Sequence, residues 1–398
     1  MSIQNQEIGF DPDALRLKYK AERDKRVRAD GNDQYQEVEG DFAYFVDDPY
    51  IDKTLQRGPV KDEIEVAIIG GGFGGMLAAA RLREAGIDDF RVIEKGGDFG
   101  GTWYWNRYPG ASCDIESYVY FPLLEKTQFA PQQKYTNAAE TLNYCRVIAE
   151  KYDLHANALM QTKVTCTEWD EDSRRWLVKT DRGDAIKARF VVHSNGPLNR
   201  PKLPAISGIT SFKGHTFHTS RWDYGYTGGN SDGDLNKLKN KRVAVIGTGA
   251  TAVQCVPHLG ASAAELYVFQ RTPSSIDLRN NQPTDPDWLA SQKPGWHEAR
   301  RRNFESLMAG VPVKQDLVND GWTEAFRLLF GTVRDKAPSK LRIACWALLA
   351  VGSRDFYRKG AKKYLTEKAM RHMQFDKEME LADFRKMESI RARVDRLV

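Results

Sequence analysis

Two glycine-rich turns carry the residue spacing that most directly suggests chemistry in this sequence. Gly70, Gly72 and Gly75 form a GxGxxG pattern, the spacing with which a chain binds the pyrophosphate of a dinucleotide. Gly70 can make the tight turn, Gly72 lets the backbone approach the phosphates, and Gly75 lets a helix pack closely on a strand. A glycine-rich turn with a purely structural role is the alternative, and the flanking elements decide between the two.

The segments around this turn are those that a phosphate-binding site requires. The apolar run 64–69 predicts a buried parallel strand, and residues 76–86 predict a helix that ends at a glycine. The start of that helix would present free N–H groups and a positive dipole end to the phosphates. A second strand, 90–94, ends at Glu94, 22 residues after Gly72, where a carboxylate holds ribose hydroxyls. This combination predicts dinucleotide binding.

The second turn contains Gly247, Gly249 and Ala252, and it also lies between a short apolar strand and a helix. Alanine is acceptable in the third position because only close packing is required there. The next strand ends at Arg271, again 22 residues after the second motif glycine. A carboxylate there would suit NAD, whereas Arg271 with Thr272 suits the additional 2′-phosphate of NADP. The sequence therefore predicts FAD at the first turn and NADPH at the second.

The segment 100–120 is rich in Trp, Tyr, Gly and Pro, a composition that predicts neither a helix nor a plain strand. Flat aromatic rings beside flexible backbone suit the walls of a pocket for a planar cofactor, and an aromatic core loop is the alternative. Asp114 is the carboxylate singled out in this loop, although an isolated Asp often serves a turn or cap. Residues 194–197 predict a second close approach of the backbone, or a plain connector.

Length and composition restrict the class of protein. The 398 residues suffice for two or three packed domains, and 41% hydrophobic residues indicate an ordered globular chain. The net charge of +5 arises from 59 basic and 54 acidic residues, so a mixed surface is expected and nucleic acid is not an expected partner.

The five cysteines show no CxxC pair and no metal-ligand spacing, so no metal site is expected and a reduced, cytoplasmic protein is predicted. The N-terminus lacks a basic-then-apolar leader. The apolar run 343–351 predicts a core helix, because it is far shorter than the roughly 20 residues that span a bilayer.

The predicted fold class is α/β, with two Rossmann-like dinucleotide-binding domains, a small β-meander from three strands between residues 164 and 194, and a helical subdomain whose Trp, Phe and Leu residues are mainly core. A solvated helix begins after Asp11, with Pro12 at its first position. The expected segments are an N-terminal arm (1–60), the first part of the FAD-binding domain (61–208), the linker with the first part of the NADP-binding domain (209–278), and the helical subdomain (279–398).

The segment 212–223, FKGHTFHTSRWD, lies between the two turns and resembles the fingerprint of flavin-dependent Baeyer-Villiger monooxygenases. It matches at every defined position, whereas related enzymes that oxygenate nitrogen and sulfur carry a similar fingerprint without this Trp-Asp ending. The runs GGTWYWNRYPG, SNGPLNRPKLP and VFQRTP resemble the same family, over roughly residues 42–398. The matching fingerprint positions are Phe212, Gly214, His218, Trp222 and Asp223.

The resemblance implies a role for each candidate residue. Asp114 would lie near the flavin and nicotinamide and orient a catalytic arginine. The fingerprint would serve communication between the cofactors; without it, a linker histidine such as His218 would be a packing residue. The implied cofactor contacts are Gly70, Gly72, Gly75, Glu94, Thr102, Trp103, Asp114 and Tyr120 for FAD, and Gly247, Gly249, Ala252, Arg271 and Thr272 for NADP.

The implied reaction is an NADPH- and FAD-dependent insertion of one oxygen atom from O2 next to a ketone carbonyl, giving an ester or lactone through a flavin peroxide. Oxygenation of sulfides or amines is one alternative, and a truncated, non-catalytic nucleotide-binding chain is another. A disulfide reductase is disfavoured because CxxC is absent.

The chain departs from the family in two places. Ser194 and Asn195 replace the usual Ala-Thr, and the family's KRP-type arginine segment does not occur before Val398. Dependence on a missing C-terminal segment, and little oxygenation activity at this length, are therefore expected.

Overall fold

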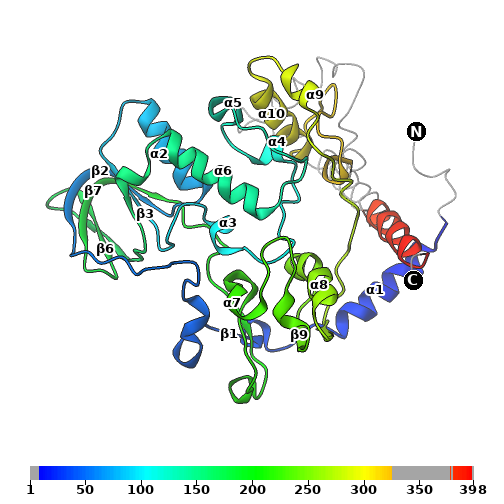
Figure 1. The fold of residues 1–398 in the computed structure, drawn as a ribbon. Coiled ribbons are helices and arrows are strands. Elements are labelled where there is room, and N and C mark those ends of the chain that lie inside the picture. Colours follow the sequence, from blue (N-terminus) through cyan, green and yellow to red (C-terminus); the bar gives the residue numbers. More distant parts are fainter. Residues whose placement is uncertain (1–8, 325–376, 378–379, 397–398) are drawn as a thin grey trace, which may run out of the picture. The chain divides into compact units, whose positions relative to one another are not determined.

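A computed structural model describes residues 9–324, 377 and 380–396 (Figure 1). The chain divides into two compact units. The larger contains residues 28–274 and 281–291, and the smaller contains the described parts of 1–27, 275–280 and 292–398. Both glycine-rich turns lie in the larger unit.

A six-stranded sheet forms the first half of the larger unit, with strand order β4-β3-β2-β7-β6-β5. The first four strands are parallel, and β7, β6 and β5 continue as antiparallel neighbours. This confirms the predicted parallel sheet and the β-meander. The strands are β2 (Lys61–Ile69), β3 (Phe90–Ile93), β4 (Ala158–Leu159), β5 (Val164–Asp170), β6 (Arg175–Thr180) and β7 (Ala185–His193).

Helices α2 (Phe73–Glu84) and α6 (Ala138–Lys151) lie beside this sheet (Figure 1). Met76, Ala79 and Ala80 of α2 are fully buried, and the small side chains of Ala79 and Ala80 allow the helix to pack closely. The predicted end of α2 is confirmed, since Gly86 has a φ of +75°, a conformation that favours glycine after a helix.

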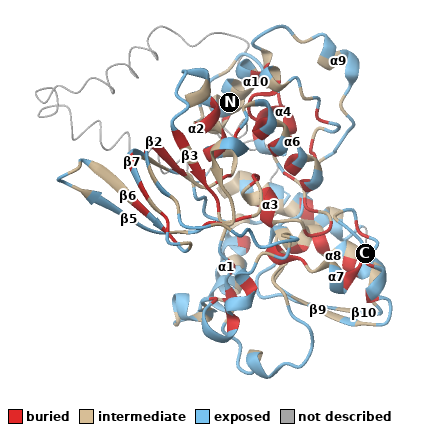
Figure 2. Cartoon of the chain, turned by 60° about the vertical axis from the view of Figure 1, so that its left-hand side comes forward, coloured by how far each residue is buried: buried red, intermediate tan, exposed pale blue. Residues whose placement is uncertain are grey.

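The second strand–turn–helix unit consists of β9 (Arg242–Ile246), α8 (Ala250–Ser262) and β10 (Glu265–Phe269), and its two strands pair in parallel. The strands are far less buried than β2 and β3 (Figure 2). Ile246 and Phe269, which pair across the ladder, are each 59% exposed. The predicted α/β class with two such units is confirmed.

The aromatic segment contains two single-turn helices, α3 (Thr102–Trp105) and α4 (Ser117–Tyr120), so the prediction that it contains no helix is wrong. A helical turn of four residues requires only two main-chain hydrogen bonds. In α3 the amide of Trp105 donates to the carbonyl of Gly101, and the amide of Asn106 donates to the carbonyl of Thr102. Burial of the aromatic side chains stabilises these turns in place of helix propensity.

The smaller unit contains α1 (Pro12–Asp24), α10 (Trp296–Met308) and a helix at 380–394. Asp11 caps α1 as predicted, with its Oδ1 accepting from the amides of Asp13 and Ala14. The predicted helix at 343–351 lies outside the described residues, as do residues 325–376 of the predicted helical subdomain.

The larger unit also contains short elements that connect the main ones. They are β1 (Tyr35–Gln36), β8 (Leu203–Pro204), α5 (Leu124–Thr127), α7 (Tyr224–Thr227), α9 (Pro286–Ala290) and the 3₁₀ helices Gly31–Gln34, Gly40–Val46, His155–Asn157, Ile209–Ser211, Thr219–Arg221 and Asn236–Leu238.

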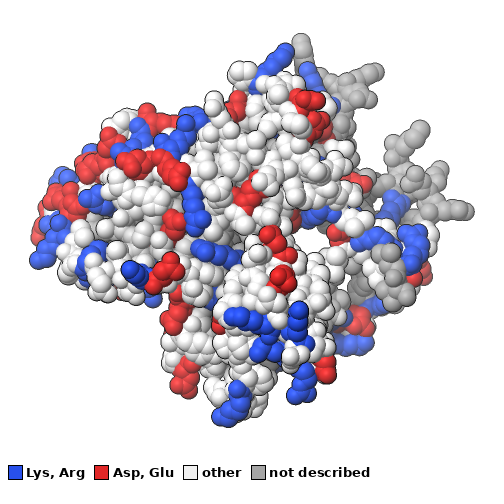
Figure 3. Space-filling view, viewed as in Figure 1, with Lys and Arg blue, Asp and Glu red and all other residues white. Residues whose placement is uncertain are grey.

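Basic and acidic side chains are mixed over the face seen in Figure 3. Within the described ranges, no helix is long and apolar enough to cross a membrane. The same residues contain no group of three or more His, Cys, Asp or Glu side chains that could hold a metal ion. Cys145, Cys166 and Cys255 are free thiols.

Candidate functional site

The first glycine-rich turn leaves no room for side chains at two of its three motif positions. Gly70 has a φ of +106°, and a Cβ there would lie 2.5 Å from the carbonyl oxygen of Ser194. A Cβ at Gly75 would lie 1.8 Å from the carbonyl oxygen of Gly70. Glycine is therefore required at both positions by the turn and by the packing of α2 on β2.

A second glycine pair faces this turn across a very short distance. Gly101 has a φ of +53°, and a Cβ there would lie 2.6 Å from the Cα of Gly72. The amide of Gly100 donates to the carbonyl of Gly71 at 2.9 Å. Two loops about thirty residues apart thus meet backbone to backbone at the start of α2.

Glu94 lies at the end of β3 and is 5% exposed. Its Oε2 accepts from the amide of Gly71 at 2.6 Å, and its Oε1 accepts from the amide of Gly96 at 2.7 Å. These charge-assisted bonds fix the carboxylate beside the glycine-rich turn. The structure therefore places Glu94 next to the turn with which its spacing associated it.

A cavity of about 540 Å³ lies along the carboxyl ends of β2, β3 and β7, the edge where parallel sheets bind ligands. Gly70, Gly72, Glu94, Thr102, Trp103 and Tyr120 line it, and Gly75 supports it from behind. Asp114 is exposed and does not belong to the lining. The remaining walls come from residues 162–167 and 193–199 and from the aromatic segment.

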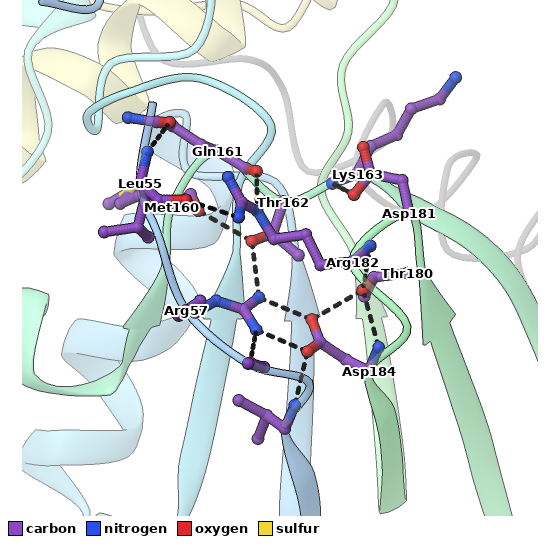
Figure 4. Close-up of polar contacts among 12 residues, drawn as sticks. Leu55, Arg57, Met160, Gln161, Thr162, Lys163, Thr180, Asp181, Arg182 and Asp184 are labelled. Atoms are coloured by element: carbon purple, nitrogen blue, oxygen red, sulfur yellow. Dashed lines mark hydrogen bonds and ion pairs between the residues drawn. The ribbon is translucent and has the colours of Figure 1, made fainter. Parts of the chain in front are cut away.

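The wall at 162–167 is held in place by a buried polar network (Figure 4). Arg57 Nη2 donates to Thr162 Oγ1 at 2.9 Å and to Asp184 Oδ2 at 2.7 Å. The amide of Thr162 donates to the carbonyl of Glu94 at 2.9 Å. The network therefore links the segment before β2 to the strand end that carries Glu94.

Aromatic side chains form the wall nearest α3. Trp103 Nε1 donates to Tyr120 Oη at 3.1 Å, and the two rings meet edge to face with centroids 5.8 Å apart. Burial raises the pKa of Tyr120 to about 12, so its hydroxyl keeps its proton at neutral pH. These two rings give the cavity an aromatic boundary on this side.

Two neighbouring cations were not predicted from the sequence: Lys95, which lines the cavity, and Arg221, which is buried outside its lining. Lys95 Nζ donates to the carbonyl oxygen and to Oδ1 of Asn199, at 2.9 and 3.0 Å. It lies 5.1 Å from the centre of the Trp105 ring, and the Arg221 guanidinium lies 3.7 Å from the same ring. Burial, with repulsion from Arg221, lowers the pKa of Lys95 to about 8. The one available sequence signal was a lysine directly after Glu94.

The second glycine-rich turn is more open than the first. Gly247 has a φ of +105°, but a Cβ at Gly247 or Gly249 would meet no atom within 4 Å. Ala252 is 7% exposed and occupies the close-packing position. Thr248 Oγ1 donates to the carbonyl of Thr272 at 3.0 Å, so the turn is joined to the end of β10.

Arg271 follows β10 and is exposed. Its Nη1 donates to Gln34 Oε1, and its Nη2 donates to Tyr35 Oη at 3.3 Å. Both acceptors belong to the N-terminal arm, in which no chemical motif had been recognised. The sequence placed Arg271 near the second turn but gave no indication of these partners.

The fingerprint segment has structural roles at each defined position. Trp222 is 2% exposed, and its Nε1 donates to Thr227 Oγ1 at 3.1 Å. His218 Nδ1 accepts from the amide of Ser220 at 3.2 Å, and burial lowers the His218 pKa to about 4.

Its other positions are turn and cap residues. Asp223 Oδ1 accepts from the amide of Tyr226 at the start of α7, at 2.9 Å. A Cβ at Gly214 would lie 2.5 Å from the ring of Phe212, which is itself 63% exposed. None of these five residues lines the cavity.

The cavity residues fit an FAD-type dinucleotide. The backbone of Gly70 and Gly72 lines the cavity without side chains, and the start of α2 directs amides toward it. A carboxylate, the lining lysines Lys95 and Lys163, and aromatic walls add partners for ribose, phosphate and a planar ring. The donor set and the steric requirements therefore agree with the predicted FAD site.

Comparison with known proteins gives a family match. Residues 67–291 match the family model described as pyridine nucleotide-disulphide oxidoreductase. The neopentalenolactone D synthase of Streptomyces avermitilis is 52% identical over 98% of this chain and 60% of its own length. The Baeyer-Villiger monooxygenase ATR8 of Stachybotrys chlorohalonatus is 46% identical over 99% of this chain and 59% of its own length. The chain thus spans about 60% of the length of these relatives.

Two solved structures agree with these matches. The polycyclic ketone monooxygenase of Thermothelomyces thermophila is 36% identical, with a TM-score of 0.78 over 97% of this chain and 61% of that chain. A complex of OTEMO with FAD and NADP is 34% identical, with a TM-score of 0.55 over 64% of this chain and 46% of that chain.

Proposed function

The chain belongs to the pyridine nucleotide-disulphide oxidoreductase family and is a relative of Baeyer-Villiger monooxygenases, and on this premise we propose that it binds FAD and NADPH and acts in the oxygenation of ketones. The products are esters or lactones, formed by insertion of one oxygen atom from O2 next to the carbonyl. Its relatives of known structure include a ketone monooxygenase and an enzyme crystallised with FAD and NADP.

FAD binds in the cavity next to the first glycine-rich turn. The amides at the start of α2 hold the pyrophosphate, with Gly72 as the point of closest approach, and Glu94 holds the ribose. Thr102, Trp103 and Tyr120 border the cavity on the aromatic side. Bound FAD supplies the hydride acceptor and the activation of oxygen that the reaction needs.

The protein's own contribution is orientation, charge and exclusion of water. The edge-to-face pair of Trp103 and Tyr120 closes one wall of the cavity, and the tyrosine hydroxyl stays protonated. Asp114 is proposed to lie on the nicotinamide side, where it would orient a cation.

NADPH binds at the second turn, where Gly247 and Gly249 leave the backbone open and Arg271 with Thr272 receives the 2′-phosphate. The fingerprint segment joins this unit to the FAD unit through the buried Trp222. Residues 61–208 and 209–278 are accordingly proposed as the first parts of the FAD- and NADP-binding domains. A cytoplasmic location is proposed from the sequence alone.

One observation carries the proposal: the steric requirement for glycine at Gly70 and Gly75, directly beside the buried carboxylate of Glu94. The test is to purify the chain, add FAD, and measure bound flavin by absorbance after gel filtration. We expect about one FAD per chain, and a loss of binding in Glu94→Gln. Thr165→Val, a change elsewhere in the cavity lining, is the matched control.

Turnover is tested separately, by NADPH oxidation with paired ketone and sulfide substrates and identification of the products. Ester or lactone formation supports ketone oxygenation, and exclusive sulfoxide formation contradicts it. Disulfide reduction is not proposed, because the sequence contains no CxxC pair.

A further inference from the structure

We propose that Gln34 and Tyr35 of the N-terminal arm form part of the site that discriminates NADP from NAD, by positioning the guanidinium of Arg271. This inference rests on the proposed function, since it concerns the cofactor bound at the second glycine-rich turn. It assigns a binding role to an arm whose sequence carries no nucleotide motif.

The arm is anchored where it passes Arg271. Strand β1 pairs with β8 of the interdomain segment, with Tyr35 opposite Pro204. The amide of Ala205 donates to the carbonyl of Gln34 at 3.0 Å. These main-chain bonds hold Gln34 and Tyr35 in a defined place, independently of their side chains.

A small core fixes the next residues of the arm. Val38, Phe42 and Phe45 are each 6% exposed or less, and they pack together with Leu203, the first residue of β8. Burying four apolar side chains gives the arm a stabilising contact of its own. The arm is therefore a packed element of the larger unit at this point.

The contacts of Arg271 leave its charge available to an anion. Gln34 Oε1 and Tyr35 Oη are neutral acceptors, and together they engage Nη1 and Nη2. A guanidinium has five N–H donors, so donors remain for a phosphate after both bonds are made. Neutral partners orient the side chain without the neutralisation that a carboxylate would cause.

Further charges around the pair agree with a phosphate site. Lys202 Nζ lies 5.6 Å from the centre of the Tyr35 ring, which adds a second cation next to the arm. The nearby acid, Asp30, is bound by Arg28, whose guanidinium lowers the Asp30 pKa. Its charge is therefore compensated within the arm itself.

The 2′-phosphate of NADP is the group that distinguishes it from NAD, and Arg271 stands where the fold places the residue that reads this group. If Arg271 loses its orientation, the chain should bind NADP⁺ more weakly, while its affinity for NAD⁺ should stay nearly unchanged. If the arm has a purely structural role, substitutions in it should weaken the binding of both ligands alike. The ratio of the two affinities therefore separates the alternatives.

The test is calorimetric titration of the full chain, saturated with FAD, with NADP⁺ and with NAD⁺. Tyr35→Phe should lower the NADP⁺/NAD⁺ affinity ratio by roughly two- to tenfold, the worth of one hydrogen bond. Gln34→Glu, which sets a negative charge against the guanidinium, should lower it by roughly tenfold or more. Tyr44→Phe and Gln36→Glu make the same chemical changes elsewhere on the arm and should leave the ratio unchanged.

Arg271→Gln separates this inference from the proposed function. If wild type prefers NADP⁺ and Arg271→Gln loses the preference, while the Gln34 and Tyr35 variants keep it, the inference is overturned and the proposed function stands. If the wild type shows no preference for NADP⁺, the proposed cofactor is wrong and the inference falls with it. A drop in the ratio in Arg271→Gln and in the Gln34 and Tyr35 variants, with none in Tyr44→Phe and Gln36→Glu, supports the inference.

Discussion

Arg57 binds Asp184 through both terminal nitrogens of its guanidinium, with Nη1–Oδ1 and Nη2–Oδ2 distances of 2.6 and 2.7 Å (Figure 4). The Asp184 side chain has no exposed surface, and its oxygens also accept from the amide of Val60 and the hydroxyl of Thr180, both at 2.7 Å. The segment 57–60 before β2 and Thr180 at the end of β6 thus share one buried carboxylate.

Replacing Arg57 with Met should lower the free energy of unfolding by about 3 kcal/mol, because it leaves the Asp184 charge buried without its cation. Urea unfolding followed by circular dichroism measures this. Lys179→Met is the control, since its 3.2 Å pair with Glu168 is largely exposed and should be worth less than about 1 kcal/mol. Equal losses in the two variants would contradict a special role for the buried pair.

Acid should selectively remove the contribution of Asp184. The Arg57 guanidinium holds the pKa of this carboxyl well below its usual range, whereas an unfolded aspartate has a pKa of about 3.9. The folded state therefore gains stability from the charged form above about pH 4, and this gain declines as pH falls further. The unfolding free energies of wild type and Asp184→Asn should converge in that acidic range, and parallel curves would refute the linkage.

Gly75→Ala should abolish retention of FAD, because the added Cβ would lie 1.8 Å from the carbonyl oxygen of Gly70. Gly74→Ala is a close control on the same helix, since its Cβ would meet only the Ser194 side chain at 3.6 Å. Flavin content after purification is the measurement. Full flavin content in Gly75→Ala would show that the helix can shift to accept the methyl group.

FAD binding should weaken in alkaline solution through Lys95. Its pKa is lowered to about 8 by burial and by Arg221, so the ammonium loses its charge as pH rises through and above that value. The dissociation constant for FAD should rise roughly tenfold between about pH 7 and pH 9.5, the worth of one charge-assisted bond. Lys95→Met should bind FAD more weakly than wild type at neutral pH, and its dissociation constant should not change as the pH rises.

Lys163→Met provides the matched control for Lys95, because Lys163 is an exposed lysine that also lines the cavity. It should retain the wild-type pH dependence. If Lys95→Met shows the same alkaline weakening as wild type, another group is responsible and the assignment is wrong.

The parts of the fold fixed by local sterics were predictable from the sequence. Gly70, Gly75 and Gly86 adopt conformations or contacts that only glycine tolerates well: Gly70 follows β2, Gly75 lies in the first turn of α2, and Gly86 follows the end of α2. Glu94 was found because strand length and helix length together determine where the second strand ends.

The remaining parts of the site depend on contacts between distant segments. Arg221, Lys95 and Asn199 meet around Trp105 only because the chain returns to the same place after about a hundred residues, and no local spacing records this. The partners of Arg271 come from the N-terminal arm for the same reason. In α3, burial stabilised a helical turn that composition disfavoured.

The close contact of Gly72 with Gly101 has a consequence for engineering and for mutational surveys. The backbones of the two loops are in direct contact. Neither loop can therefore be replaced by the loop of a homologue unless the other is replaced with it. A random screen for loss of flavin should recover substitutions at Gly101 as often as in the GxGxxG run, although position 101 lies outside that run.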